Sequence, residues 1–352
     1  MKDQMTPLER ASAYNRGKTI DRLPCVPIVG NTAARIIGVK VSEFKRNGRL
    51  IAEAHTASYR LFGYDNVRIF TDLYMLAEAM GAEVACPEDE TAHLLAPALE
   101  DEREIDTLVP ADPYKDSNLS QFLEAIKRTL DAVGSEAPVT GVVTCPFTTA
   151  SFLIGTEKIT RMMLKNPEAV HKLCEVSLQS ALQYAKAIMD EGAAPSLTEP
   201  MSSGTVISRK HFEVFSYPYL KKLAEYIHGR GKAVTLHICG KTDRIWDLMA
   251  DAGADCISID NEASLTAAKE KVGDRVRLMG NVHPSEVMLG GTASDVKNAV
   301  EECVNQAADS PKGFIVAAGC SLPTETPLDN IHAMMDAVRA IGYPVSFAKR
   351  GI

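Results

Sequence analysis

The chain has 352 residues, enough for a large hydrophobic core, and a formal net charge of −8 without any Lys/Arg-rich run. This charge balance argues against nucleic-acid binding as the main task, and no apolar stretch approaches the roughly 18 residues of a membrane span. The first residues, MKDQMTPLERASAYN, contain no apolar signal-peptide core, so we expect a cytoplasmic protein. Its eight cysteines are then expected to be reduced thiols, available for metal binding or catalysis.

Eight short apolar runs recur along the chain, each followed by a stretch with helical spacing. Several are apolar throughout, which is typical of parallel strands covered on both faces. The runs are 25–30, 66–70, 138–144, 194–199, 233–239, 255–260, 275–281 and 313–320. Eight strands alternating with helices predict a (β/α)₈ TIM barrel. An open doubly wound sheet is the alternative, but no glycine-rich phosphate loop follows the first run.

Three features modify this simple barrel. The residues before the first strand are predicted to form an N-terminal helical extension. The stretch from about 71 to 137 is too long for one crossover, and in GAEVACPEDETAHLLAPAL two apolar runs flank PEDE, which indicates a hairpin-like insertion after strand 2. The helical segment 156–192 is expected to break at Asn166-Pro167. With no internal repeat or low-complexity tract, residues 1–352 are interpreted as a single domain.

Polar and metal-binding side chains follow five of the predicted strands at their carboxyl ends. Because these ends meet on one rim of a barrel, and this rim is the functional face, we expect them to converge. The residues are Glu199, His237 with Cys239, Asp260, Asn281 and Cys320.

His237 and Cys239 are two residues apart at the end of an extended run, so their side chains point the same way. A soft thiolate with an imidazole favours zinc over magnesium or calcium, and Cys320 supplies a second sulfur on the rim. Three protein ligands drawn from distant segments are typical of a catalytic zinc with an exchangeable fourth position. The alternative is that all three are incidental packed residues. The other six cysteines have no comparable partners, and Cys174 is assigned to helix packing.

Beyond these residues, the chain resembles the uroporphyrinogen decarboxylase superfamily over nearly its full length. The segments that carry the resemblance are MTPLERASAYNRGKTIDRLP at the start, FTDLYMLAEAMGAEV at 70–84, HFEVFSYPYLKKLAEYIHGRGKAVTLHICG at 211–240, MGNVHPSEVMLGGT at 279–292 and GFIVAAGCSLPTETPLDNIHAMMDAVR at 313–339. The resemblance implies a (β/α)₈ barrel whose pocket lies at the strand carboxyl ends.

Two branches of this superfamily differ in their motifs. The methylcobamide:coenzyme M methyltransferases and related corrinoid enzymes carry His-x-Cys-Gly and, much later, Gly-Cys-x-x-Pro. The matching residues here are His237, Cys239, Gly240, Gly319, Cys320 and Pro323. True decarboxylases need no metal and carry an arginine-rich stretch after the first strand, where this chain reads PIVGNTAARIIG with Arg35 alone.

The methyltransferase resemblance implies zinc held by His237, Cys239 and Cys320. Asp260 takes the place where the more distantly similar cobalamin-independent methionine synthases use a glutamate ligand. The fourth position is expected to hold water or a weakly bound carboxylate, with Asp260 the first candidate and Glu199 the second. Asp72 is similar in position to the family's substrate-binding aspartate, although it is equally suited to cap the helix that follows. Glu199, Asp260 and Asn281 are also expected at the substrate site.

The resemblance therefore implies a zinc-dependent methyltransferase that moves a methyl group between a corrinoid on a separate carrier protein and a small thiol such as coenzyme M. In a second hypothesis the zinc enzyme demethylates a methoxy or methylamine compound and loads the corrinoid protein. A third is a metal-free tetrapyrrole decarboxylase, and a fourth is a non-catalytic corrinoid-binding scaffold. Nucleic acids and membranes are not expected partners.

Overall fold

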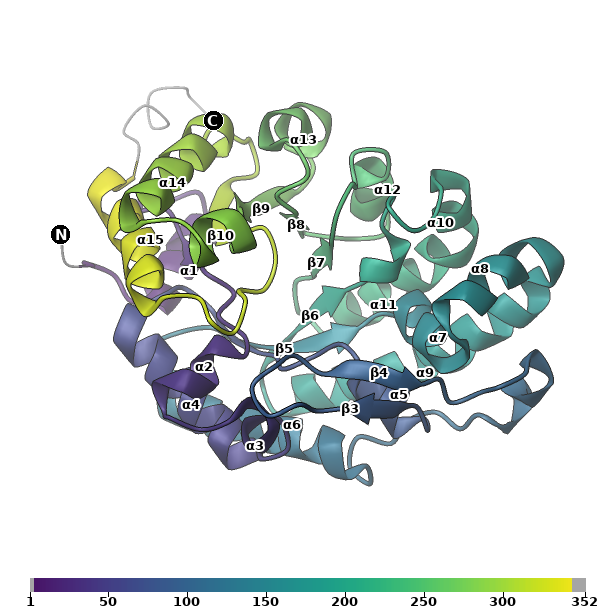
Figure 1. Cartoon of the computed structure of the whole chain (residues 1–352). Helices are drawn as coiled ribbons and strands as arrows, with labels where there is room; N and C mark the ends of the chain where they lie inside the picture. The colour runs from purple at the N-terminus through teal and green to yellow at the C-terminus, as the bar shows by residue number, and fades with distance from the viewer. Residues whose placement is uncertain (1–2, 344–352) are drawn as a thin grey trace.

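The computed structural model describes residues 3–343, and a curled sheet of eight parallel strands occupies its centre (Figure 1). From β2 to β10, neighbouring strands in the main sheet are also consecutive in the chain, in the order β2, β5, β6, β7, β8, β9 and β10. The first strand, β1, pairs with the last, β10, and β1 and β2 are the two ends of the curl. The bounds of the eight strands are β1 Cys25–Val26, β2 Val67–Ile69, β5 Val139–Thr144, β6 Ala194–Thr198, β7 Thr235–Ile238, β8 Cys256–Ile259, β9 Arg277–Val282 and β10 Phe314–Ala318. All eight predicted strands are therefore present.

The two ends of the sheet approach each other without a regular ladder. The backbone N–H of Asp65, just before β2, donates to the carbonyl of Cys25 in β1 over 2.9 Å, and the Asp65 carboxylate accepts from the Cys25 N–H over 2.7 Å. The predicted first strand extended to residue 30, but β1 ends at Val26. The reason is local, because Pro27 has no N–H to donate and Ile28 adopts a φ of 60°. The result is a TIM-barrel-like α/β fold.

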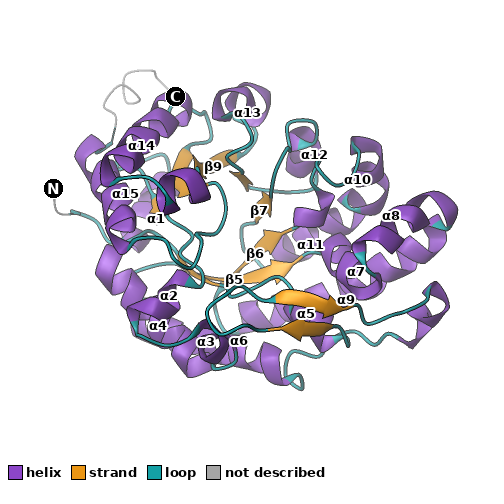
Figure 2. Cartoon of the chain, in the orientation of Figure 1, coloured by secondary structure: helices purple, strands orange, loops and turns teal. Residues whose placement is uncertain are grey.

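Helices cover the outside of the curled sheet (Figure 2). The α-helices are α1 Pro7–Asn15, α2 Thr32–Ile36, α3 Val41–Lys45, α4 Gly48–Phe62, α5 Met75–Ala79, α6 Ser117–Val133, α7 Pro146–Ile154, α8 Thr156–Lys165, α9 Pro167–Asp190, α10 Arg209–Phe215, α11 Tyr217–Gly229, α12 Trp246–Asp251, α13 Leu265–Val272, α14 Ala293–Ala307 and α15 Leu328–Ile341. Short helical turns are η1 Glu102–Thr107, η2 Pro200–Ser202 and η3 Pro284–Leu289. Within the described residues, none of the helices has the length and apolar character needed to cross a bilayer.

Two of these helices begin where the sequence carries start signals. The Thr6 hydroxyl and the Glu9 carboxylate form a reciprocal capping box at α1, which is the predicted N-terminal helix. The predicted break at Asn166-Pro167 separates α8 from α9, because the Asn166 side chain accepts from the N–H of Ala169 and Pro167 fits the first helical position.

The long excursion after β2 contains α5, an antiparallel hairpin, η1 and then α6. The hairpin pairs β3 (Glu83–Ala85) with β4 (His93–Ala96) and forms a sheet separate from the main one. Figure 2 shows this pair of strands apart from the strands of the main sheet.

The interior of the barrel has an apolar side and a polar side. A small buried cluster of Val26, Ile28, Cys256, Met279 and Ala317 fills the side formed by β1 and β8–β10. The facing strands β2, β5, β6 and β7 instead direct polar side chains into a cavity that crosses the interior; these are Arg68, Thr140, Ser196, Thr198, Thr235 and His237. A TIM-barrel interior is ordinarily filled by bulky branched side chains, so this polar half prepares a binding site.

At the amino ends of the strands, charged side chains are paired with one another. Arg10 of α1 and Arg22 both donate to the carboxylate of Asp65, and Arg10 also donates to Asp21 over 2.7 Å. Arg10 and Arg22 are almost completely buried. We call these four residues the base network. It joins α1 to the seam between β1 and β2.

Candidate metal centre

His237 reaches the barrel interior because of its register in β7. Leu236 and Ile238 lie on the face of β7 that packs in the main hydrophobic core, so the alternate residues Thr235 and His237 point inward. His237 is paired with Thr198 of β6 on one side and with Ser258 of β8 on the other. The Ser258 hydroxyl lies 3.0 Å from His237 Nδ1, which fixes the ring and leaves Nε2 facing the rim.

The glycines of both sequence motifs are required by close packing beside the cysteines. Gly240 has a φ of 69°, and a Cβ there would lie 2.5 Å from Thr205 Oγ1. Gly319 precedes Cys320, and a Cβ on it would lie 2.6 Å from the backbone nitrogen of Asn261. Only glycine lets these loops approach closely enough to bring the two cysteines together.

Three side chains that could bind a metal meet at the carboxyl ends of β7 and β10. His237 Nε2 lies 3.1 Å from Cys239 Sγ, and Cys239 Sγ lies 3.7 Å from Cys320 Sγ. The three potential ligand atoms all lie within 4.8 Å of one another. We call this set the rim cluster. His237 is buried and both cysteines are partly exposed, so the cluster is accessible from the cavity mouth.

The two thiols of the rim cluster are electrostatically coupled. Their mutual hydrogen bond lowers the pKa of Cys320 and raises the pKa of Cys239, so a proton held by Cys239 is shared with a Cys320 thiolate. His237 adds to the lowering at Cys320. A metal cation would replace that shared proton and stabilise both thiolates.

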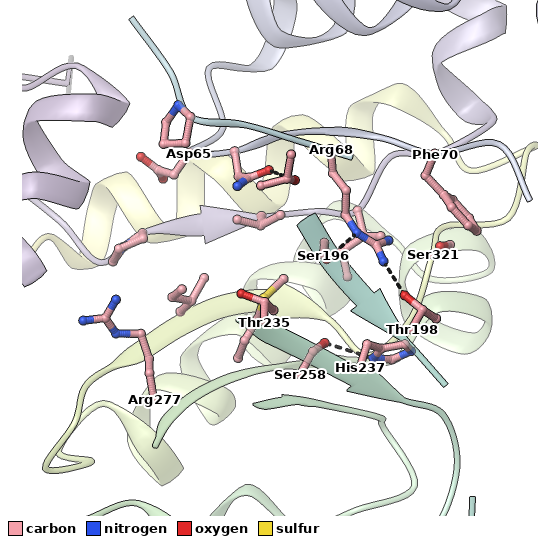
Figure 3. A pocket seen from close by; sticks show the side chains of 18 of the residues that line it. Asp65, Arg68, Phe70, Ser196, Thr198, Thr235, His237, Ser258, Arg277 and Ser321 are labelled. Atoms are coloured by element: carbon pink, nitrogen blue, oxygen red, sulfur yellow. Dashed lines mark hydrogen bonds between the residues drawn. The ribbon is translucent and has the colours of Figure 1, made fainter. Parts of the chain in front are cut away.

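The strand patterns did not identify Arg68 as part of the site. It lies in the middle of β2 between the buried Val67 and Ile69, and its side chain enters the same cavity as the rim cluster (Figure 3). Its guanidinium donates to Ser196 over 3.3 Å and to Thr198 over 2.9 Å. Burial lowers the pKa of Arg68 to about 10. The available signal was a single charged residue alternating with apolar neighbours in NVRIF.

Comparison with known proteins identifies the family to which this chain belongs. The family model described as uroporphyrinogen decarboxylase (URO-D) matches residues 6–341. The chain belongs to the URO-D family. The resemblance read from the sequence motifs is therefore confirmed.

Within the URO-D family, the relatives include both activities. The chain is 28% identical to the methylcobamide:CoM methyltransferase MtaA of Methanosarcina barkeri, covering 93% of this chain and 96% of that protein. It is also 28% identical to a uroporphyrinogen decarboxylase of Anaeromyxobacter dehalogenans, covering 88% and 90%. A solved structure of a methyltransferase from Methanosarcina mazei matches with a TM-score of 0.86 and 26% identity, over 96% of this chain and 99% of that one.

Two predicted site residues of this URO-D chain lie near the rim cluster but outside it. Asp260 follows β8, and its charge contributes to raising the pKa of Cys239. Its Oδ1 accepts from the N–H of Glu262 over 3.1 Å, and the set of three close ligand atoms does not include it. Asn281 donates to the carbonyls of Asp260 and Ala263, so it holds the loop that carries Asp260.

Glu199 and Asp72 are both buried and do not line the cavity. Glu199 accepts from the N–H groups of Phe147 and Thr148 at the start of α7, each over 3.0 Å. Burial raises the pKa of Glu199 to about 7. Asp72 accepts from the Tyr74 N–H over 2.8 Å and lies 3.2 Å from Lys45 Nζ. Tyr74 is the N-cap of α5 and no side chain caps this helix, so Asp72 braces the turn before α5 without capping it.

Proposed function

We propose that this protein is a zinc-dependent methyltransferase that transfers a methyl group between a corrinoid, carried on a partner protein, and a small thiol such as coenzyme M. The observation that carries the proposal is the rim cluster, which gathers an imidazole nitrogen and two sulfurs from distant segments at one cavity mouth. The similarity to a methylcobamide:CoM methyltransferase over 93% of the chain supports the same reading.

The donor set fits zinc. One nitrogen and two sulfurs on the functional rim match the ligands of a catalytic site, in which an exchangeable position remains for substrate. The Ser258 contact at His237 Nδ1 is the kind of outer hydrogen bond that orients a ligating histidine. We retain Asp260 as the proposed weak fourth ligand, because its carboxylate is close enough for its charge to act on Cys239. Zinc in this position would supply a Lewis acid that keeps a substrate thiol deprotonated at neutral pH.

The residues of the chain have separate tasks in this proposal. A proton on His237 Nδ1, donated to Ser258, keeps the Nε2 lone pair directed at the rim. Cys239 and Cys320 contribute negative charge, which maintains the nucleophilicity of a nearby substrate sulfur. In the direction of thiol methylation, the bond between the substrate sulfur and the methyl carbon would form as the methyl–cobalt bond of the corrinoid substrate breaks, and the corrinoid would keep both electrons of that bond. The thiol proton leaves to solvent.

Tetrapyrrole decarboxylation is less well supported. In the segment 26–38, the lone arginine Arg35 donates to the carbonyls of Thr324 and Thr326, so it is engaged by the loop after β10. A substrate with eight carboxylates would find no arginine cluster there. We therefore expect no conversion of uroporphyrinogen.

We also propose that residues 1–352 form a single domain, which the family match over residues 6–341 supports.

The test is a methyl-transfer assay with methylcobalamin and 2-mercaptoethanesulfonate, following the cobalt spectrum. We expect transfer by the zinc-loaded protein and none by Cys239→Ser. Cys174→Ser should retain activity, because Cys174 of α9 is buried in the hydrophobic core and its thiol donates to the Phe215 carbonyl. Activity that survives complete zinc removal would contradict the proposal. Formation of coproporphyrinogen from uroporphyrinogen would favour the decarboxylase instead.

A further inference from the structure

Arg68 is a cation in the barrel interior without a carboxylate partner. None of the ion pairs among residues 3–343 includes it. The carboxylate that lines the same cavity, Asp65, is already engaged by Arg10 and Arg22. The Arg68 guanidinium lies 5.2 Å from the centre of the Phe70 ring, and the acidic groups that favour its charge are the thiols of Cys239 and Cys320. A buried cation that no carboxylate offsets is costly, so its position favours an anionic ligand.

The Arg68 side chain points along the barrel toward the rim cluster. Its backbone is level with Thr140 of β5 and, through it, with Ala194 of β6. The guanidinium nevertheless contacts Ser196 and Thr198, which lie further toward the carboxyl end of β6. Thr198 is the β-sheet partner of His237. Figure 3 shows the guanidinium directed at Thr198, beside the His237 ring.

Several donors around Arg68 have no acceptor among the described residues. Arginine carries five N–H groups, and the described hydrogen bonds engage only Nε and Nη2. The hydroxyls of Ser196 and Thr198 accept from Arg68, and in the described part of the chain neither donates a hydrogen bond. A planar guanidinium with two neighbouring hydroxyl donors matches a carboxylate or sulfonate, whose oxygens accept in a fork.

We propose that Arg68, Ser196 and Thr198 form an anion pocket that binds the terminal oxoanion of the substrate thiol while its sulfur lies at the rim cluster. The pocket selects small thiols that carry a sulfonate or carboxylate on a short linker. This inference rests on the proposed function, because that proposal places the sulfur of the substrate at the rim cluster. The binding of the oxoanion by Arg68, Ser196 and Thr198 is tested separately, by affinity measurements that need no methyl transfer.

Calorimetric titration of the zinc-loaded protein compares 2-mercaptoethanesulfonate and 3-mercaptopropionate with the uncharged 2-mercaptoethanol. We expect the anionic thiols to bind about tenfold to a hundredfold more tightly, in line with charge-assisted hydrogen bonds. In Arg68→Met this preference should fall to about onefold, and Arg68→Lys should retain part of it. If sulfonate binds and carboxylate does not, the pocket is specific for the three-oxygen anion.

The matched control is Arg277→Gln. Arg277 lines the same cavity at its other end, where it lies over the Tyr14 ring at 4.6 Å and donates to Asn15. This variant should keep the full preference for anionic thiols.

Two results would overturn the pocket. One is equal affinity of the wild-type protein for charged and uncharged thiols, a measurement that needs no variant to fold. The other is a fall in binding affinity by the same factor for charged and uncharged thiols in Arg68→Met. That result would mean that Arg68 acts only by offsetting the negative charge of the rim cluster. A protein that shows the binding preference but transfers no methyl group would contradict the proposed function and leave the pocket standing.

Discussion

The two ends of the barrel gather charged or ionisable side chains in opposite ways. In the base network, Arg10 and Arg22 donate to Asp65, and Asp65 also accepts from the backbone of β1. In the rim cluster, His237 lies 3.1 Å from Cys239, and Cys239 lies 3.7 Å from Cys320, with no carboxylate or guanidinium among the three. The charges of the base network offset one another within the chain, whereas the rim cluster consists of side chains that could bind a metal.

This difference separates stability from function within one fold. Burying charges is tolerated at the base because each charge meets an opposite one, and loss of either partner would leave the other buried alone. At the rim the two thiols are coupled to each other and meet no opposite charge within the cluster, an arrangement suited to binding a metal cation. Substitutions at the two ends should therefore affect different measurements.

The largest expected effect is at the base. Asp65→Asn removes the charge shared by two buried arginines, so the free energy of unfolding should fall by about 3–5 kcal/mol. Chemical denaturation of wild type and variant measures this change. The control is Glu124→Gln, which breaks a half-exposed helix pair with Arg128 and should cost less than about 1 kcal/mol. A similar small loss in both variants would show that the base network does not stabilise the fold.

Glu199 gives a pH-dependent test of a buried carboxylate that forms no ion pair within residues 3–343. Its pKa rises from 4.5 to about 7 on folding because burial outweighs its hydrogen bonds. The stability it contributes is therefore present below pH 4.5 and is lost as pH rises through about 7. Relative to Glu199→Gln, the wild-type protein should lose up to about 3 kcal/mol of unfolding free energy between pH 5 and pH 8. An unchanging difference across that range would refute the assignment.

A smaller effect should separate the rim cluster from the anion pocket. Ser258→Ala removes the hydroxyl that orients His237, so zinc affinity should fall about tenfold to a hundredfold in a competition with a chelator. Ser196→Ala is the matched variant, because its hydroxyl contacts Arg68. It should leave zinc affinity unchanged and weaken the binding of anionic thiols. Equal zinc losses in both variants would mean that the two sites are not separable.

Local patterns predicted most of the barrel and its rim. Apolar runs located all eight strands, and the alternation of His237 and Cys239 placed both side chains in the same direction. The early end of β1 depends on the backbone conformation at Ile28, which no periodicity reveals. The base network and the Arg68 contacts join residues far apart in the chain, so they emerge only from the closed topology. Glu199 has the sequence position of a rim ligand, yet it binds the start of α7 because the strand ends with its side chain outside the cavity.

The central claim is that the rim cluster binds zinc, and metal analysis of the purified protein combined with zinc X-ray absorption tests it most directly. We expect about one zinc per chain, lost in Cys320→Ser and His237→Ala and retained in Cys174→Ser. We also expect two sulfur ligands in the substrate-free protein and one more when 2-mercaptoethanesulfonate is added. Full zinc content in both rim variants, or three sulfurs before any thiol is added, would contradict the account.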